Sequence, residues 1–283
     1  MIYILTSIVL FALNNVLWKK NLQNSSVPFL IGYRAFFTTT LATSLLLYMH
    51  GFEIYQNQPI GKITLGSLFG VLGLFCMLTV LKKAPLQWLG IYNLIGIFFT
   101  ALYLYFFENT PVMKSILGLI IIVVGFLFYV YFNRESETKI SPKQHLVLLV
   151  MTLSFGISSL IHWKNLGTKV PAILIISNQE LVVFISATLL IFFTLKTPEI
   201  KFQLKSYFSK AIMMALVIFL ALLFSFLGLQ VSDPLISSIL FLATPLLTIV
   251  FGTLFYKEKM SLINSISILI IAAGAFILHY QNS

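Results

Sequence analysis

Long uncharged stretches separated by short polar or charged segments run through the whole sequence. Stretches of about twenty residues, at about 1.5 Å per residue in a helix, are long enough to cross the hydrocarbon of a bilayer. The apolar runs are continuous rather than alternating, which argues against a β-barrel and predicts an all-α membrane protein. The pattern predicts ten spanning helices, at about residues 2–18, 28–49, 63–81, 85–107, 115–132, 146–163, 171–195, 211–231, 234–256 and 260–280.

Two of these segments resemble each other in layout. Residues 86–107 and 235–256 carry no charge, each follows a proline, and each ends close to a glutamate, Glu108 in one case and Glu258 in the other. Because the two segments lie half a chain apart, they indicate an internal duplication.

The starts of the two halves also correspond. The segment FALNNVLWKKNL near the beginning of the chain resembles FGISSLIHWKNL in its middle. The predicted units are therefore residues 1–140 and 141–283, with five helices in each. An odd number of spans per unit requires the second unit to insert upside down relative to the first, so we expect two inverted five-helix repeats.

Composition supports a membrane protein. Hydrophobic residues make up 59% of the chain and charged residues only 9%, whereas soluble domains average about 25% charged residues. The formal charge of +10 is carried mostly by short loops, where membrane topology explains it better than nucleic-acid binding. We therefore expect membrane lipid and no nucleic acid as a partner. The single cysteine, Cys76, allows no intramolecular disulfide.

The duplicated five-helix pattern resembles EamA-type transporters of the drug/metabolite transporter superfamily. The residues that carry the resemblance are Asn14, Lys19, Arg34, Glu108, Pro245, Glu258 and Gly274. The resemblance implies ten membrane-spanning helices and transport of small molecules. The chain departs from the family pattern at two places, and both concern the cargo more than the fold. Ile95 occupies the position in the first half that corresponds to Pro245 in the second. Gln179 or Glu180 occupies the position in the second half that corresponds to Arg34 in the first.

Two arguments about orientation oppose each other. Thirteen of the eighteen Lys and Arg residues lie in odd-numbered loops, four lie in even-numbered loops, and one lies inside a span. The positive-inside rule then places the odd-numbered loops in the cytoplasm and both termini outside. The family resemblance implies both termini inside.

Glu180 is the most conspicuous polar residue within a predicted span. It lies nine residues past Pro171, about 13–14 Å along a helix and near the bilayer midplane, directly after Asn178 and Gln179. A carboxylate at this depth costs roughly 2.5–3.5 kcal/mol on insertion scales, so it should face a cavity or a partner. We predict Glu180 as a proton-coupling group; a structural acid paired with a neighbour is the alternative.

Arg34 occupies a similar place in the first half. It lies six residues past Pro28, about 9 Å along its helix. Its guanidinium is suited to binding an anionic group of a substrate in a central cavity. The alternatives are that it extends to the membrane interface or pairs with Glu180.

Polar and aromatic side chains follow one face of the first, fourth, sixth and ninth predicted helices. Such stripes suit a cavity that stacks against and hydrogen-bonds an organic molecule, although they also occur in helix packing. The predicted substrate-binding residues are Asn14, Trp18, Arg34, Tyr92, Asn93, Ser158, Asn178, Gln179, Glu180 and Thr244.

Other polar residues are assigned structural roles. His162, near a helix end, is expected to be solvated at the interface. Glu108 and Glu258 are expected to cap the following helix or to bond loop amides. Close helix packing is expected at three glycines of the third span, Gly66, Gly70 and Gly73.

The sequence contains no motif for catalysis, metal binding or nucleotide binding, so neither an enzyme nor a cofactor is expected. We predict a secondary transporter, with export the favoured direction, that moves small organic metabolites such as amino acids or amphipathic compounds across the cytoplasmic membrane by alternating access. The alternatives are an intramembrane lipid-modifying enzyme, a channel and a non-transporting scaffold. A homodimer is one possible assembly.

Overall fold

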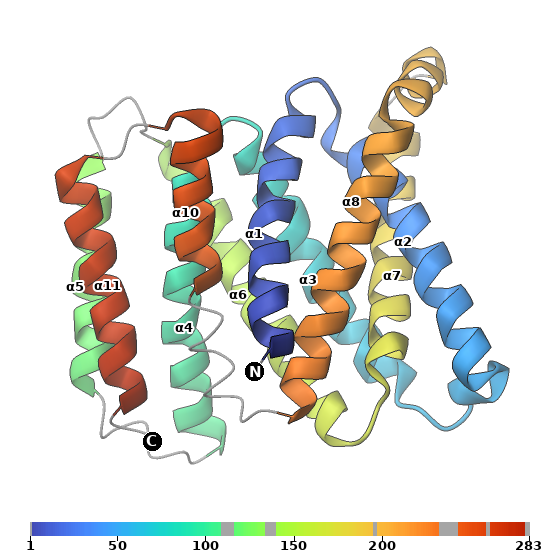
Figure 1. Cartoon of the computed structure of the whole chain (residues 1–283), viewed down its shortest axis with the longest axis horizontal. Coiled ribbons are helices and arrows are strands. Elements are labelled where there is room, and N and C mark those ends of the chain that lie inside the picture. Colours follow the sequence, from blue (N-terminus) through green and yellow to red (C-terminus); the bar gives the residue numbers. More distant parts are fainter. Residues whose placement is uncertain are drawn as a thin grey trace.

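The computed structural model describes residues 2–108, 116–133, 140–194, 197–231, 243–258 and 261–280, and within these ranges it is helical without strands. A short 3-10 helix, η1 (Phe52–Tyr55), follows the second α-helix. The α-helices are α1 (Ile2–Leu22), α2 (Val27–His50), α3 (Ile60–Leu81), α4 (Leu86–Glu108), α5 (Ile116–Asn133), α6 (Pro142–Gly167), α7 (Ala172–Thr194), α8 (Thr197–Val231), α10 (Ala243–Tyr256) and α11 (Leu262–Tyr280) (Figure 1). The prediction of an all-α protein is confirmed.

Local sequence explains where several helices begin. The Ser26 hydroxyl accepts a hydrogen bond from the amide of Phe29, and Pro28 stands in the first turn of α2. α6 begins with a capping box, in which the Ser141 side chain accepts from the Gln144 amide and the Gln144 side chain accepts from the Ser141 amide.

One predicted loop is wrong. Residues 197–210 belong to α8, although the sequence pattern placed a loop over 196–210. Charges end an apolar run without ending a helix, because the backbone hydrogen bonds continue where the side chains reach water. Ser232 and Asp233, residue types that favour a helix N-cap before the predicted span 234–256, lie outside the described residues.

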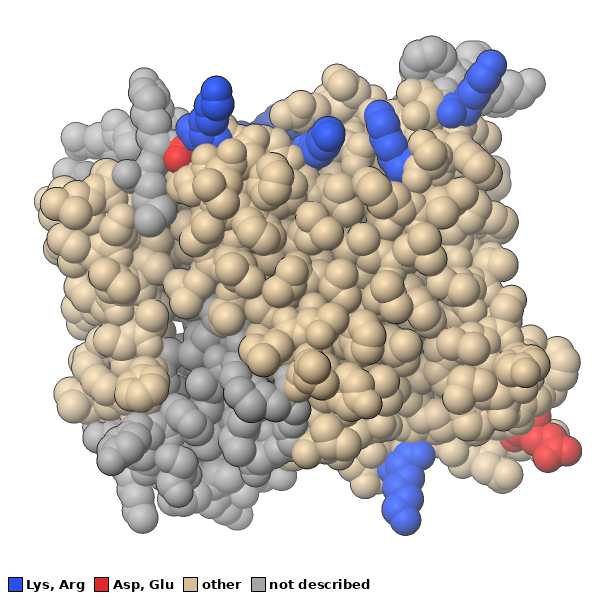
Figure 2. Space-filling view, viewed as in Figure 1, with Lys and Arg blue, Asp and Glu red and all other residues tan. Residues whose placement is uncertain are grey.

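The helices suit a membrane in length and surface. Within the described ranges, six helices are long and apolar enough to span a bilayer, and three shorter apolar helices accompany them. Large apolar side chains point outward, with Phe192 79% and Phe193 85% exposed. On the face drawn in Figure 2, basic side chains lie mostly at one end of the bundle, where α1 ends and α4 begins, and the described surface between the two ends shows no charged side chain. We refer to this as the basic end.

The most extensive helix packing joins the first half of the chain to the second. α1 packs on α8, α3 on α6, α2 on α7, and α5 on α11. Further contacts join α3 to α7, α2 to α8, α1 to α10, α4 to α6, and α4 to α10. The two halves are therefore interleaved, and residues distant in sequence meet between them.

Glycines allow α3 to approach α6 closely. A methyl group added at Gly66 would lie 2.8 Å from the His162 ring, and one added at Gly73 would lie 2.7 Å from the Phe155 ring. At Gly70 it would lie 3.1 Å from the Ser158 hydroxyl oxygen. The predicted packing role of these glycines is confirmed.

The glycine contact gives a stability prediction. We expect Gly73→Ala to lower the free energy of unfolding by about 1–3 kcal/mol, because the Phe155 ring must move to admit the methyl group. Gly61→Ala, also in α3, is the matched control, since nothing lies within 4 Å of the added atom. Unfolding of both variants in detergent measures the difference. Equal stability of the two variants would contradict the assigned role of Gly73.

Candidate functional site

A buried ion pair joins α2 to α7. The Arg34 guanidinium donates from Nη1 to Oε2 of Glu180, and both side chains are only 2% exposed. Of the alternatives left open for Arg34 by the sequence, pairing with Glu180 is the one observed. Two charges removed from solvent in this way are held by their mutual attraction, and either one alone would be strongly unfavourable.

Trp18 covers the ion pair from α1. The Arg34 Cζ atom lies 5.5 Å from the centroid of the Trp18 ring, a cation–π arrangement. The Nε atom of Arg34 is buried and has no hydrogen-bond partner within the described residues. The guanidinium thus retains one donor that its present neighbours do not satisfy, and a donor of this kind can bind a carboxylate or phosphate oxygen.

Hydrogen-bonded side chains join α7 to its neighbours in the turn before Glu180. The amide oxygen of Asn178 accepts from the Ser67 hydroxyl at 3.0 Å, and its amide nitrogen donates to Thr64 at 3.1 Å. The Thr43 and Ser177 hydroxyls are 2.8 Å apart. These bonds tie α7 to both α3 and α2, so the position of Glu180 is fixed from two sides.

Ser158 and Gln179 meet at Gly70. The Gly70 backbone, from α3, faces both the Ser158 hydroxyl oxygen and the Gln179 side-chain nitrogen; a methyl group there would lie 3.1 Å from the first and 4.0 Å from the second. Ser158 is buried and Gln179 is half-buried. The structure therefore brings Trp18 and Arg34 together with Glu180, and Ser158 together with Gln179 at Gly70. Asn178, the chain neighbour of Gln179, bonds to α3 instead.

The remaining predicted binding residues lie in other surroundings. The Tyr92 hydroxyl is 2.8 Å from Nδ1 of His145, and its ring packs against Trp88 and Phe126. His145 is a partner that the sequence pattern did not indicate, because it lies on α6, 53 positions away. Asn93 is half-buried on α4.

Two further predicted residues contain buried oxygens without a hydrogen-bond partner within the described ranges, the Asn14 side-chain carbonyl and the Thr244 hydroxyl. The neighbouring Asn15 donates to the Thr248 hydroxyl at 3.1 Å and so joins α1 to α10. The contribution of each of these residues to substrate binding stays a prediction.

The expectation that His162 is solvated is wrong. The residue is 2% exposed, and neither ring nitrogen has a hydrogen-bond partner within the described part of the chain. Its ring packs 5.8 Å from the Phe226 ring and against the Gly66 backbone. Because α6 continues to Gly167, His162 lies inside the helix rather than at its end.

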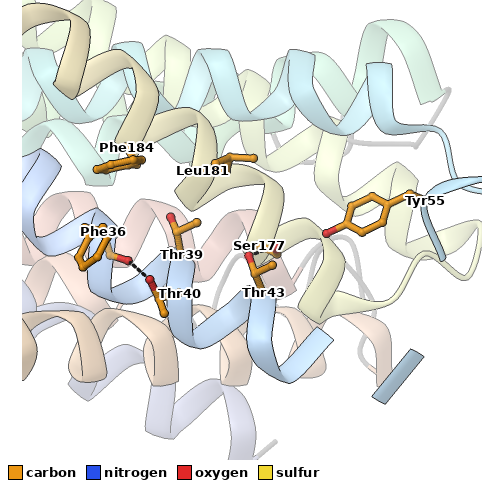
Figure 3. Close-up of a pocket in the computed structure, with 8 residues that line it drawn as sticks. All are labelled: Phe36, Thr39, Thr40, Thr43, Tyr55, Ser177, Leu181 and Phe184. Carbon is orange, nitrogen blue, oxygen red and sulfur yellow. Dashed lines mark hydrogen bonds between the residues drawn. The ribbon is translucent and has the colours of Figure 1, made fainter. Parts of the chain in front are cut away.

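A groove of about 340 Å³ runs along the seam between α2 and α7 (Figure 3). Threonine and serine hydroxyls line its middle, with two phenylalanine rings at one end and a tyrosine at the other (Figure 3). Leu181 and Phe36 are 42% and 46% exposed, whereas Glu180 is 2% exposed, so the groove opens on the outer side of the helix pair. None of the predicted binding residues lines it. Its lining residues are Phe36, Thr39, Thr40, Thr43, Tyr55, Ser177, Leu181 and Phe184.

Comparison with solved structures gives the fold a precedent. A crystal structure of a protein with 16% sequence identity superposes with a TM-score of 0.68, over 98% of this chain and 94% of the other. At this identity the likeness concerns the fold alone. No curated protein sequence matches the chain.

Comparison with family sequence profiles identifies the second half. Residues 143–280 match EamA, the EamA-like transporter family. This range begins in α6 and extends to the end of α11, so it contains Glu180 and Glu258. The resemblance inferred from the sequence is thereby confirmed over this range: residues 143–280 match the model of the EamA-like transporter family.

Proposed function

We propose that the protein is a secondary transporter that moves small organic metabolites, such as amino acids or amphipathic compounds, across the cytoplasmic membrane by alternating access, with export as its direction. The family match and the apolar helices support a membrane transporter. The cargo class follows from the mixture of aromatic, amide and charged side chains around Arg34 and Glu180.

Helix packing supports two inverted repeats. The proposed repeat relates α1 to α6, α2 to α7, α3 to α8, α4 to α10, and α5 to α11. Exchanging the two helices of every such pair turns each major helix contact into a contact that is also observed. The α1–α8 pair becomes α6–α3, α3–α7 becomes α8–α2, and α1–α10 becomes α6–α4; α2–α7, α5–α11 and α4–α10 map onto themselves. Short loops make successive helices antiparallel, so α1 and α6 run in opposite directions. Interleaved units of this kind suit a rocking motion of one unit against the other.

The observation that carries the proposal is the buried Arg34–Glu180 ion pair. It joins two helices that the proposed repeat exchanges, and the Trp18 ring packs over its guanidinium. A proton on Glu180 would neutralise its charge and weaken the attraction to Arg34. An anionic group of the cargo could then bind the released guanidinium, which links ion movement to cargo movement.

Counterflow in proteoliposomes tests the transport activity. Vesicles loaded with one member of a panel of amino acids and amphipathic amines should take up the same labelled compound, and the uptake should saturate with external concentration. Protein-free vesicles provide the background. Ion conductance without saturable exchange would identify a channel, and the absence of both would favour a scaffold or an enzyme; either result would contradict the proposal.

A further inference from the structure

Glu258 caps a helix from the other half of the chain. It lies two residues beyond α10, and its carboxylate accepts hydrogen bonds from the amides of Leu86 at 2.7 Å and Gln87 at 3.2 Å. These are the first two residues of α4, whose amides have no partner within the helix. A carboxylate at a helix N-terminus is also favoured by the helix dipole. The capping role expected for Glu258 is confirmed, but the capped helix is α4 rather than the one that follows.

The backbone around Glu258 aims the carboxylate at α4. Lys257 adopts φ 53°, in the left-handed region, which turns the chain back at the end of α10. The Glu258 amide then bonds to the Gly252 carbonyl at 3.3 Å. A methyl group at Gly252 would lie 2.6 Å from Oε2 of Glu258, so only glycine leaves the present space for the carboxylate.

α1 is fastened to the same place. The Lys19 ammonium donates to the carbonyl oxygens of Ala84 and Leu81, in the turn between α3 and α4, and also interacts electrostatically with Glu258. The Tyr256 hydroxyl donates to the Val16 carbonyl at 2.7 Å. α1, α4 and α10 are thus joined at the basic end, which is the upper end in Figure 1.

We propose that Glu258 is a positioning residue that holds the basic end of the transporter closed in this structure, by fastening α10 to the first turn of α4. This inference rests on the proposed transport function, because alternating access requires each end of the protein to open in turn. The carboxylate–amide bonds suit such a contact: they are charge-assisted, they involve only backbone groups of α4, and they can be broken without unwinding either helix.

Labelling of a buried cysteine tests the closure without measuring transport. Ala84, 2% exposed in the turn that Lys19 contacts, becomes the reporter as Ala84→Cys in a Cys76→Ser background. We expect Glu258→Gln to raise the rate of its reaction with a water-soluble maleimide about 5- to 30-fold, the population change that follows a small loss of stability. Glu53→Gln, which removes an exposed carboxylate from η1, is the matched control and should leave the rate unchanged.

An unchanged rate in Glu258→Gln would overturn the proposal whatever the transport result. If Glu258→Gln raises the labelling rate but the unmodified protein shows no counterflow, the contact is supported and the transport function is contradicted. The two failures are therefore distinguishable.

A cross-link keeps the proposal testable if Glu258→Gln does not fold. A Cβ atom at position 252 would lie 3.3 Å from the Leu86 Cβ, close to the Cβ separation found in disulfides. In the Cys76→Ser background, oxidation of the Leu86→Cys, Gly252→Cys pair should abolish counterflow, and a reductant should restore it. Counterflow that continues at the same rate with the cross-link formed would show that this end need not open, and would overturn the proposal.

Discussion

Arg34→Met should lower the free energy of unfolding by about 3–5 kcal/mol, because it leaves the Glu180 carboxylate buried without a cation. Glu180 is 2% exposed, so water cannot take over the role of the guanidinium without rearrangement of α2 and α7. Unfolding by denaturant in detergent, followed by circular dichroism or tryptophan fluorescence, measures the loss. Trp18, packed over the guanidinium, is a reporter at the site itself.

The double variant Arg34→Met, Glu180→Met separates loss of the ion pair from loss of packing. Apolar side chains of similar length remove both charges at once, so most of the stability lost in the single variant should return. The difference between the double variant and the sum of the single variants gives the coupling energy of the pair. If the effects of the two substitutions simply add, the two charges do not depend on each other, and the ion pair does not hold α2 to α7.

Local sequence predicted most helices because apolar length and proline or serine caps are local properties. Ser26 and Pro28 begin α2, and the end of the apolar run near His50 lies close to the end of that helix. The start of α8 was not predicted, because an apolar run is a local property and this helix begins before its apolar run. Lys201 and Lys205 end the apolar pattern, but the backbone of a helix can continue into water.

Pairing between helices was harder to predict. The sequence placed Arg34 and Glu180 at comparable depths on two helices, yet it left pairing, cargo binding and extension to the interface open as alternatives for Arg34. The choice depends on which faces of α2 and α7 meet, and neither helix has a clear apolar face because lipid and protein both contact apolar side chains.

Glu258 and His162 show the same limit. The position of Glu258 after an apolar helix predicts a cap, but its target lies 172 positions away and only tertiary packing brings it there. His162 was expected at an interface because charges follow it closely in sequence. The structure buries it instead, since the glycine at position 66 makes room for the imidazole between α3 and α6.

Neutralising the ion pair should remove the coupling of transport to a proton gradient. The double variant Arg34→Met, Glu180→Met contains no acid at the α2–α7 contact, and an acid is required there to bind the coupled proton. We expect the ratio of gradient-driven accumulation to counterflow to fall at least about tenfold, equivalent to about 1.4 kcal/mol of coupling. Taking the ratio separates coupling from any weakening of cargo binding, which would lower both rates.

The exchanged variant Arg34→Glu, Glu180→Arg is the matched control, because it retains one acid, one guanidinium and an ion pair between the same two helices. An acid still reaches the contact from α2, so the ratio of gradient-driven accumulation to counterflow should stay above that of the neutral variant. Equal loss in both variants would mean that the acid must be on α7 itself. Accumulation by the neutral variant at the unmodified ratio would exclude Glu180 as the proton-coupling group and leave the ion pair a structural role, because a group that has been removed cannot bind the transported proton.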